Sequence, residues 1–410
     1  MKAKINNMLS SLRASSKIKT ALIISTIILI GLYVFSIPTF GAGSLFNKSN
    51  YILYIVMALL GVLTIFTTLV YSTFKVRWVI LLVPIFAIYA LLGTLIYSHE
   101  YRSWLTLLLM AIALFILFYA FRFVSNKNVI LLTIISGFTI FALTYIFVLR
   151  KDIFNLSNWG RMGAPFEHPN TLSGYMVVAS SITLYLLFFL DKKIKYVLLV
   201  PLALFLLVGL TNGSRTFIIL FILLLVVLAV FRFRKNKWVL LGILGGIVLL
   251  LVILLSLPML ETLRFRLFNS FATIFGTSST PDTSTLQRLS WFNYGFSLGG
   301  NKFITGYGVD GFSIYSGTYT YTHSNLSEVV CDFGVIGAVI FYLPLGVLLY
   351  QNIKKFDKHS PLVITFIIYY LVVSFANVFY YNKVYYIVLA LLFFITYSDQ
   401  ANIDEKEIIK

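Results

Sequence analysis

Residues 238–257 read WVLLGILGGIVLLLVILLSL, a run without a single charge, and residues 232–237 just before it read RFRKNK. An apolar run of about 20 residues crosses the hydrocarbon core of a bilayer as an α-helix, which satisfies every backbone N–H and C=O internally. Lys and Arg collect on the cytoplasmic side of such helices. This stretch therefore predicts a membrane-spanning helix that starts at the cytoplasmic face.

Runs of the same kind recur along the whole chain. Hydrophobic residues make up 60% of the 410 residues, whereas a soluble domain has roughly 45–50%. We therefore predict an all-α fold: a polytopic helical bundle with about twelve membrane spans, forming one integral membrane domain over residues 1–410. The predicted spans are 20–37, 51–71, 76–97, 104–121, 129–148, 171–190, 196–210, 214–231, 238–257, 326–350, 362–380 and 384–397.

The distribution of charge sets the predicted orientation. The net charge is +18, and with the N-terminus in the cytoplasm 21 of the 32 Lys and Arg residues fall in cytoplasmic segments. Because cytoplasmic loops collect such residues, the excess indicates a plasma-membrane protein with both termini in the cytoplasm, and no nucleic-acid partner. It also places residues 258–325, between the ninth and tenth spans, in a large extracytoplasmic loop.

Four groups of polar residues stand out, and this orientation places all of them on the outer side of the membrane. The first is the loop before the sixth span, where Arg161, Glu167 and His168 lie close together in sequence. Its glycines and prolines are typical of a compact loop, and Asn170 or Thr171 suits the cap of the next helix. A loop and a cap explain the Gly, Pro and Asn residues, but not the three charged or titratable ones.

The second group lies between the seventh and eighth spans, where residues 211–215 read TNGSR. Gly213 is typical of a helix end, and Ser214 of the cap of the next helix. Arg215 then lies in the first turn of that helix, where the helix dipole opposes a cation. The position suits the binding of an anion such as phosphate, and snorkelling of the side chain to lipid headgroups is the plain alternative.

The third group lies in the long outer loop. Residues 260–271 place apolar side chains at helical spacing, with Arg266 among the charged residues between them, which predicts an amphipathic helix on the membrane surface. Residues 284–287 read STLQ, a capping-box pattern that opens a second helix carrying Arg288 and ending near Gly299. Arg288 is either part of an anion site or an ordinary solvated charge.

The fourth group begins with His323, just before the tenth span. Asn325, Glu328 and Asp332 follow at a spacing that puts them on one face of a helix. Carboxylates inside a span are costly and usually face a site or a cavity, and a buried, satisfied polar face is the alternative. The chain has only four histidines. His323 is the best placed of them to act as a general base, because an imidazole titrates near pH 6.5, about neutrality.

Several chemistries lack their sequence patterns. No pair of histidines has the spacing of a helical zinc site, and no Asp-x-Asp occurs that would hold a divalent metal on a nucleotide diphosphate. The chain has neither a Walker glycine loop nor a Gly-x-Ser-x-Gly motif. Its single cysteine, Cys331, excludes a disulfide within the chain. The energy for a reaction therefore comes from the substrate or from a gradient.

Six short motifs in order carry a resemblance to a known family. They are GRMGAPFEHPN at 160–170, NGSRT at 212–216, LQRLSW at 286–291, GYGVD at 306–310, HSN at 323–325 and FGVIG at 333–337. Together with the span count and the large outer loop, they resemble the O-antigen ligase and polymerase superfamily, which assembles bacterial cell-surface polysaccharides. The likeness covers about residues 161–347, and the spans before it share only hydropathy.

The resemblance implies an inverting glycosyltransferase that needs no metal or other cofactor. Its substrate would be a glycan carried by undecaprenyl diphosphate at the outer face of the membrane. It implies His323 as the general base on the acceptor hydroxyl, and Arg215 and Arg288 as the cations that hold the diphosphate leaving group. Bidentate pairing of Arg with phosphate suits that role. We assign seven further residues to substrate binding: Arg161, Glu167, His168, Asn170, Arg266, Asn325 and Glu328.

Ligases and polymerases of the superfamily share these motifs. A ligase transfers the whole polysaccharide to a lipid core or a protein, whereas a polymerase transfers the chain onto the next lipid-linked repeat unit. Because no feature suited to a lipid-A-core or pilin acceptor is visible, we predict a polymerase for a capsule, O-antigen or exopolysaccharide, with the ligase as an alternative. The predicted partners are the lipid-linked oligosaccharide, the bilayer, and a chain-length regulator and flippase of the same pathway.

A lipid-linked glycan transporter is the alternative from another functional class. Glu328 and Asp332 would then form a proton relay within the membrane. Transporters place their binding sites near the midplane of the bilayer, whereas the polar residues here gather on one face and in one outer loop. The pattern therefore favours an enzyme.

Overall fold

The computed structural model describes residues 15–40, 50–71, 77–149, 169–190 and 193–398, and within them every regular element is a helix. This confirms the predicted all-α fold. The helices before the outer loop are α2 (Ser16–Phe40), α3 (Asn50–Tyr71), α4 (Trp78–Gly93), α5 (Tyr101–Val124), α6 (Lys127–Thr144), α7 (Pro169–Phe189), α8 (Leu199–Thr211), α9 (Arg215–Phe233) and α10 (Lys237–Ser256). Those that follow are α11 (Glu261–Ile274), α12 (Thr283–Gly300), α13 (Gly311–Tyr315), α14 (Asn325–Lys354), α15 (Ser360–Val373) and α16 (Lys383–Tyr397).

Eight of the described helices are long and apolar enough to cross a membrane, namely α2 to α7, α9 and α14, where short π-helical turns extend α4 and α6. Four shorter apolar helices, α8, α10, α15 and α16, coincide with the other four predicted spans. The fold is therefore that of a polytopic helical membrane protein, as predicted. The number of spans, twelve, stays a prediction.

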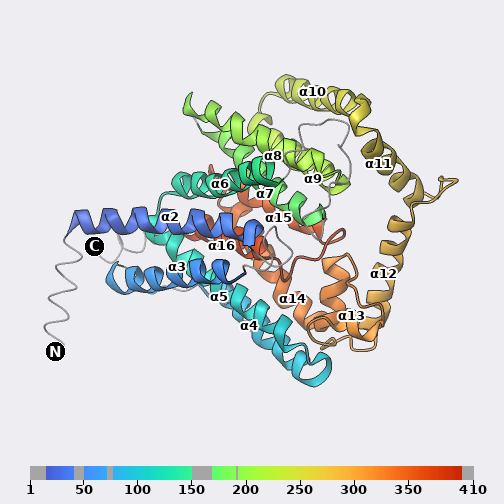
Figure 1. Cartoon of the computed structure of the whole chain (residues 1–410), viewed down its shortest axis with the longest axis horizontal. Coiled ribbons are helices and arrows are strands. Elements are labelled where there is room, and N and C mark those ends of the chain that lie inside the picture. The colour runs from blue at the N-terminus through green and yellow to red at the C-terminus, as the bar shows by residue number, and fades with distance from the viewer. Residues whose placement is uncertain (1–14, 41–49, 72–76, 150–168, 191–192, 399–410) are drawn as a thin grey trace.

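The helices pack around α16, which lies in the middle of the bundle beside α5, α14 and α15 (Figure 1). Every residue from Val384 to Ile395 is at most 4% exposed. A helix that is apolar on all sides belongs in the interior of a bundle, because no face of it suits water. The other helices surround this one and carry the exposed apolar side chains.

The predicted eleventh span, 362–380, is wrong in its second half. α15 ends at Val373, and residues 374–382 connect it to α16 without forming a helix. At 14 residues, α15 is about 21 Å long, shorter than the roughly 30 Å of a hydrocarbon core. Non-helical backbone at such depth is tolerated only when it is buried in protein, and Val378, Phe379 and Tyr380 are at most 5% exposed.

α14 is interrupted at Gly334, whose backbone has φ 63° and ψ −170°. A Cβ there would lie 2.4 Å from the carbonyl oxygen of Ile304, so only glycine fits. The loop after α12 and a side chain of α4 fill the interruption. Val335 N–H donates to the Phe303 carbonyl of the loop at 2.8 Å, and the Tyr89 hydroxyl of α4 donates to the Phe333 carbonyl at 3.1 Å. The glycine-rich motifs therefore mark a place where two backbones touch.

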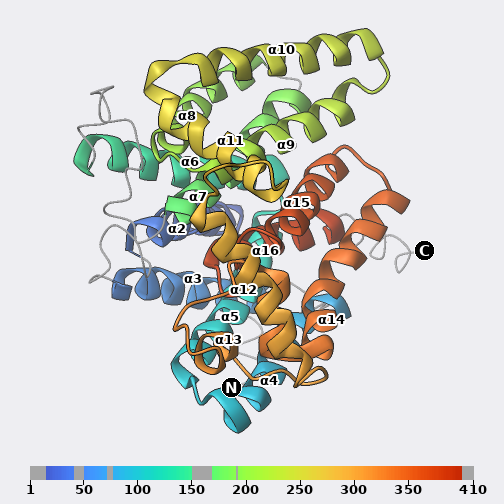
Figure 2. The same cartoon turned by 90° about the vertical axis from the view of Figure 1, so that its right-hand side faces the viewer.

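Residues 258–325, the predicted extracytoplasmic loop, fold into helices that lie across one end of the bundle. Figure 1 shows α10, α11, α12 and α13 following one another along one edge, and Figure 2, which faces that edge, shows α11 and α12 crossing in front of the other helices. α11 confirms the helix predicted there, and its Phe265, Phe268 and Ile274 are more than half exposed. The start of α9 and the start of α14 contact this layer of helices.

Candidate functional site

His323 lies in the short loop that leads into α14. Its backbone is left-handed, with a φ of 59°, a conformation that costs a non-glycine residue roughly 1–2 kcal/mol. Ser324 follows as the N-cap of α14, where its hydroxyl accepts a hydrogen bond from the backbone N–H of Ser327. Strained backbone of this kind clusters at functional sites, because the surrounding structure must hold it in place.

Buried hydrogen bonds hold the two neighbours of His323. The backbone N–H of Thr322 donates to Glu328 Oε2 at 2.6 Å, and the Thr322 hydroxyl donates to the Ser324 carbonyl at 2.7 Å. The Ser324 hydroxyl donates in turn to the carbonyl of Ser374, at the end of α15, at 2.8 Å. The position of His323 is therefore fixed by α14 and by the α15–α16 connection together.

Two aromatic side chains hold the imidazole ring of His323. The ring stacks on the indole of Trp291 in α12, with 5.3 Å between centroids and 14° between planes. Tyr321 contacts it at 4.2 Å between centroids, with the planes 57° apart. The face of an indole attracts a cation, so this stacking favours the imidazolium that forms when His323 accepts a proton.

α12 packs closely on the first half of α14. A Cβ added to Gly295 would lie 2.2 Å from the hydroxyl oxygen of Ser327, and one added to Gly299 would lie 3.1 Å from the Cα of Cys331. The Ser327 hydroxyl also donates to the Phe292 carbonyl at 2.8 Å. Small residues let helix backbones approach, so these glycines keep α12, and with it Trp291, against the start of α14.

Arg215 lies at the start of α9 and connects that helix to α11 and α12. Its Nη1 donates to Asp282 Oδ2 at 2.8 Å, to the Arg266 carbonyl at 3.1 Å, and to the hydroxyl of Ser270. The side chains of Arg215 and Asp282 are only 13% and 20% exposed. Gly213 before it is left-handed, as predicted for a helix end. The ion pair with Asp282 was not predicted.

Asp282 is the N-cap residue of α12, and the predicted capping box at 284–287 is therefore wrong by two positions. The reason is that the Asp282 carboxylate is the partner of Arg215 and also accepts the Thr285 hydroxyl. Burial acts to raise the pKa of this carboxyl, but the hydrogen bond from Thr285 and the charge of Arg215 outweigh it, so the pKa lies below its usual value. Asp282 is therefore charged at neutral pH.

Arg288 lies on α12 between this ion pair and the histidine. It follows Asp282 by six residues, about 9 Å along the axis, and precedes Trp291 by one turn. Burial raises the pKa of Tyr321, and the charge of Arg288 acts against that rise, which places the guanidinium within electrostatic range of the phenol. Arg288 is partly buried, so it is not the freely solvated charge of the alternative interpretation.

The structure thus arranges Arg215, Arg288 and His323 along one helix, α12, at one end of the bundle. Arg266 lies one helical turn before Ser270 on α11 and so shares the face toward Arg215. The guanidinium groups of Arg215 and Arg288 and one imidazole lie along about three turns of helix, with Asp282 beside Arg215. Such an array can bind an extended anion beside a proton acceptor.

Asn325 and Glu328 lie on the same side of α14 but are almost fully buried, at 0% and 1% exposed. The Asn325 side-chain oxygen accepts the backbone N–H groups of Phe379 and Tyr380, both at 2.9 Å. Asp332 is 0% exposed and accepts the N–H of Phe312 at 2.9 Å. These side chains hold loops in place, which is the buried polar face considered as the alternative.

Asn170 lies in the first turn of α7, next to the start of α9, where it accepts a hydrogen bond from the Ser214 hydroxyl at 3.2 Å. It thereby joins two helix starts near Arg215. Arg161, Glu167 and His168 lie outside the residues that the structure describes.

Sequence reasoning missed Asp282, Ser270 and Tyr321. Asp282 carries a signal that could have found it, because a cation in a helix start needs a counter-charge and few acids occur in the outer loop. Ser270 and Tyr321 carry none, since a lone Ser on a helix and a lone Tyr in a loop are common everywhere. Their roles depend on tertiary contacts.

Comparison with known proteins bears on the same region. A sequence model of the O-antigen ligase family matches residues 200–342, which include α9, α11, α12, His323 and the first half of α14. No match to the chain was found among curated proteins. The family match agrees with the resemblance predicted from the motifs. Residues 200–342 of this multi-pass membrane protein are thus similar to the O-antigen ligase family, consistent with the ligase and polymerase superfamily.

Proposed function

We propose that the protein is a polysaccharide polymerase that joins lipid-linked oligosaccharide repeat units at the outer face of the plasma membrane. The matched family is described as O-antigen ligase, and the superfamily that the motifs resemble includes both ligases and polymerases. In both reactions the donor is a glycan on a lipid diphosphate, and the acceptor distinguishes them. We assign the lipid carrier as undecaprenyl diphosphate and the product as a capsule, O-antigen or exopolysaccharide.

The proposed step is an inverting glycosyl transfer. The acceptor hydroxyl oxygen attacks the anomeric carbon of the donor sugar and forms the new glycosidic bond. The bond from that carbon to the phosphate oxygen breaks, and its electron pair leaves with the lipid diphosphate. His323 takes the hydroxyl proton, while Arg215 and Arg288, with Arg266 beside them, neutralise the charge on the diphosphate. The products are the lengthened glycan and free undecaprenyl diphosphate.

One observation carries this proposal: His323 stacks on Trp291, one turn of α12 beyond Arg288, and Arg215 binds the start of the same helix. A general base and phosphate-binding cations must lie on one side of the membrane and within one substrate length of each other. The arrangement of His323, Arg288 and Arg215 along α12 is consistent with both requirements. We assign Asn325 and Glu328 as positioning residues that hold the loop around His323, and Asn170 as one that holds the start of α9.

The excess of Lys and Arg in the predicted cytoplasmic segments supports cytoplasmic termini and an extracytoplasmic site. A substrate there has already crossed the membrane, so the proposal requires a flippase upstream. The ligase remains the second candidate within the family. It differs only in receiving the glycan on a lipid core or a protein.

The test is a reconstitution of the purified full-length protein in detergent with a lipid-linked repeat unit as the only substrate. We expect chains of two or more repeats to form in the presence of a metal chelator and without an ion gradient. A transporter would form none. A ligase would form none either, but would transfer the glycan once a lipid-core or protein acceptor was added, and that result would overturn the polymerase assignment.

A further inference from the structure

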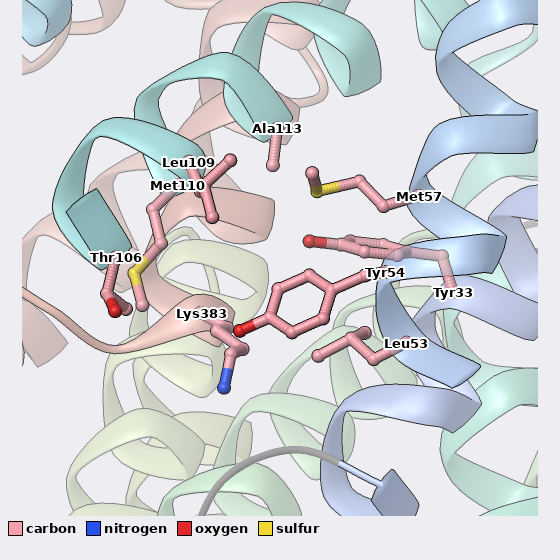
Figure 3. A pocket seen from close by; sticks show the side chains of 9 residues that line it. All are labelled: Tyr33, Leu53, Tyr54, Met57, Thr106, Leu109, Met110, Ala113 and Lys383. Carbon is pink, nitrogen blue, oxygen red and sulfur yellow. The ribbon is translucent and has the colours of Figure 1, made fainter. Parts of the chain in front are cut away.

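A pocket lies between α2, α3, α5 and the start of α16 (Figure 3). It is a shallow recess: the empty space of about 300 Å³ includes space open to the outside, and the enclosed part is about 20 Å³. Five apolar side chains line it: Leu53, Met57, Leu109, Met110 and Ala113. An apolar lining of this kind can contact part of a hydrocarbon chain that lies along it.

Lys383 brings a cation into this apolar pocket. It is the first residue of α16 and is partly buried. Among the residues that the structure describes, no carboxylate lies within ion-pair distance of its ammonium group. The start of a helix carries partial positive charge as well. A cation in such a place is costly and usually marks a binding site, because an anion from outside the chain would compensate it.

The pocket also has two hydroxyl groups and a route to the membrane. Tyr33 and Tyr54 line it, and Figure 3 shows the phenol of Tyr54 extending toward Lys383. Beside Tyr54 on α3, Ile55 and Leu59 are each 54% exposed, as expected of a surface that faces lipid. A lipid could therefore enter from the bilayer and place its phosphate at Lys383.

The pocket adjoins the histidine site but lies away from the arginines. Tyr381, two residues before Lys383, is within electrostatic range of Tyr321 and Glu328, which surround His323. Figure 2 shows α9 and α11, which hold Arg215 and Arg266, in the upper half of this end of the molecule, and α3 and α5 in the lower half. The Asn325 side chain, two residues after His323, binds the backbone N–H groups of Phe379 and Tyr380, so the segment that leads to Lys383 is attached beside the histidine loop.

We propose that the Lys383 pocket binds the lipid phosphate and adjoining hydrocarbon chain of the acceptor repeat unit, while the arginines bind those of the donor. This proposal rests on the proposed polymerase function, because a polymerase must hold two lipid-linked substrates at once. Lys383 pairs with the phosphate, the Tyr33 and Tyr54 hydroxyls donate to it, and Met57 and Leu109 contact the chain. The sugar of the acceptor then extends toward His323.

The kinetic test compares two acceptors with one lipid-linked donor. One acceptor is the lipid-linked repeat unit, and the other is the same oligosaccharide without lipid. In Lys383→Ala we expect the KM for the lipid-linked acceptor to rise about tenfold or more, since a hydrogen-bonded charge pair is lost, with little change for the lipid-free acceptor. Lys383→Arg keeps the charge and should recover most of the loss. Met57→Trp, which fills the pocket, should act like Lys383→Ala.

Arg102→Ala is the matched control, because Arg102 is an exposed cation one turn before Thr106 at the same end of α5. It should leave both acceptors unaffected. Equal KM values for Lys383→Ala and the unaltered protein would overturn the proposal. So would a loss that is the same for both acceptors, or a loss that added phosphatidylglycerol reverses, since the latter would assign the pocket to an ordinary phospholipid.

A binding measurement separates this proposal from the proposed function. Native mass spectrometry of the unaltered full-length protein with undecaprenyl phosphate should show two bound lipids. The Lys383→Ala variant and the Arg215→Ala variant should each bind only one. If no polymer forms in any assay but the count still falls from two to one in Lys383→Ala, the polymerase assignment fails and the second lipid-phosphate site stands. An unchanged count in Lys383→Ala refutes the site.

Discussion

Two neighbouring helices carry the polar residues of the site, and they use them differently. On the first half of α14, Asn325, Glu328 and Asp332 are at most 1% exposed and bind backbone groups of other segments. On α12 and at its contacts, Arg288 and Trp291 are only partly buried, as is His323. The polar groups of α14 thus fix the fold, whereas those along α12 lie where a substrate can meet them.

The difference shows why spacing alone misleads. Asn325, Glu328 and Asp332 have the spacing of a functional face, and on sequence grounds they are as good a site as the arginines. Their hydrogen bonds show that the face is used to hold loops within the membrane, where an unpaired backbone group would be costly. The predictions that follow separate loss of chemistry along α12 from loss of folding along α14.

The largest effect is expected for His323→Ala. Removal of a general base typically lowers the rate about 10²–10⁴-fold, and we expect polymer formation to fall by that amount in the reconstituted reaction. The thermal midpoint should change little, because alanine loses the stacking on Trp291 while the hydrogen bonds of Thr322 and Ser324 remain. Turnover and thermal unfolding measured on the same preparation check this.

His99→Ala is the matched control for the histidine. His99 is likewise left-handed, with a φ of 56°, and it is exposed at the same end of the bundle, after the π-helical turn at Thr94–Ser98. It lies outside the α12 site, so its loss should leave turnover unchanged. Retention of normal polymer by His323→Ala would reject the base role, and with it the contrast between the two helices.

On α14 the largest effect is expected for Gly334→Ala. A left-handed backbone costs alanine roughly 1–2 kcal/mol, and the new Cβ would meet the Ile304 carbonyl oxygen at 2.4 Å. We therefore expect the free energy of unfolding to fall by about 3 kcal/mol or more, with loss of protein from the membrane. Gly346→Ala on the same helix is the control, since nothing lies within 4 Å of its Cβ position. Equal abundance of the two variants would contradict the prediction.

Hydropathy was sufficient to predict the fold, because a lipid environment leaves the backbone few choices. Each of the twelve predicted spans overlaps an apolar helix in the structure, although the eleventh does so only in its first half. Where hydropathy failed was at 374–382, because Phe379 and Tyr380 are apolar enough to look like helix in lipid. Their backbone N–H groups are instead satisfied by Asn325, a contact across more than fifty residues that no local pattern reveals.

The site was predicted in its residue types but not in its connections. Arg215, Arg288 and His323 could be selected because charges and histidines are scarce in this chain. The ion pair between Arg215 and Asp282 could not be predicted from the sequence, because it joins the start of α9 to the start of α12. The capping motif at 284–287 misled for the same reason: Asp282 takes the N-cap position because its carboxylate pairs with Arg215 there.

A smaller effect is expected for Arg215→Lys. The Arg215 guanidinium contacts Asp282, Ser270 and the Arg266 carbonyl through a single nitrogen. An ammonium group keeps the charge but not the planar fork. We therefore expect turnover to fall about 10–100-fold, the equivalent of roughly 1.4–2.8 kcal/mol. A fall in turnover without a change in thermal midpoint would assign Arg215 to the substrate, whereas equal losses in both would make it a structural contact like those of α14.

The smallest effect is expected from the titration of Asp282. Its pKa is lowered in the folded protein, so its ion pair stabilises the fold above the unfolded-state pKa of about 3.9 and is lost as the pH falls through the folded value. Such a partly exposed pair is screened by solvent and contributes within about 1 kcal/mol. The difference in thermal midpoint between the protein and Asp282→Asn should therefore be small at pH 7 and vanish once the pH falls below the pKa of Asp282 in the folded protein. Glu261→Gln, which removes an exposed acid at the start of α11, should show no such convergence. A difference that persists at low pH would mean that Asp282 acts as a helix cap and not as a charge, and would place the start of α12 with the structural contacts of α14.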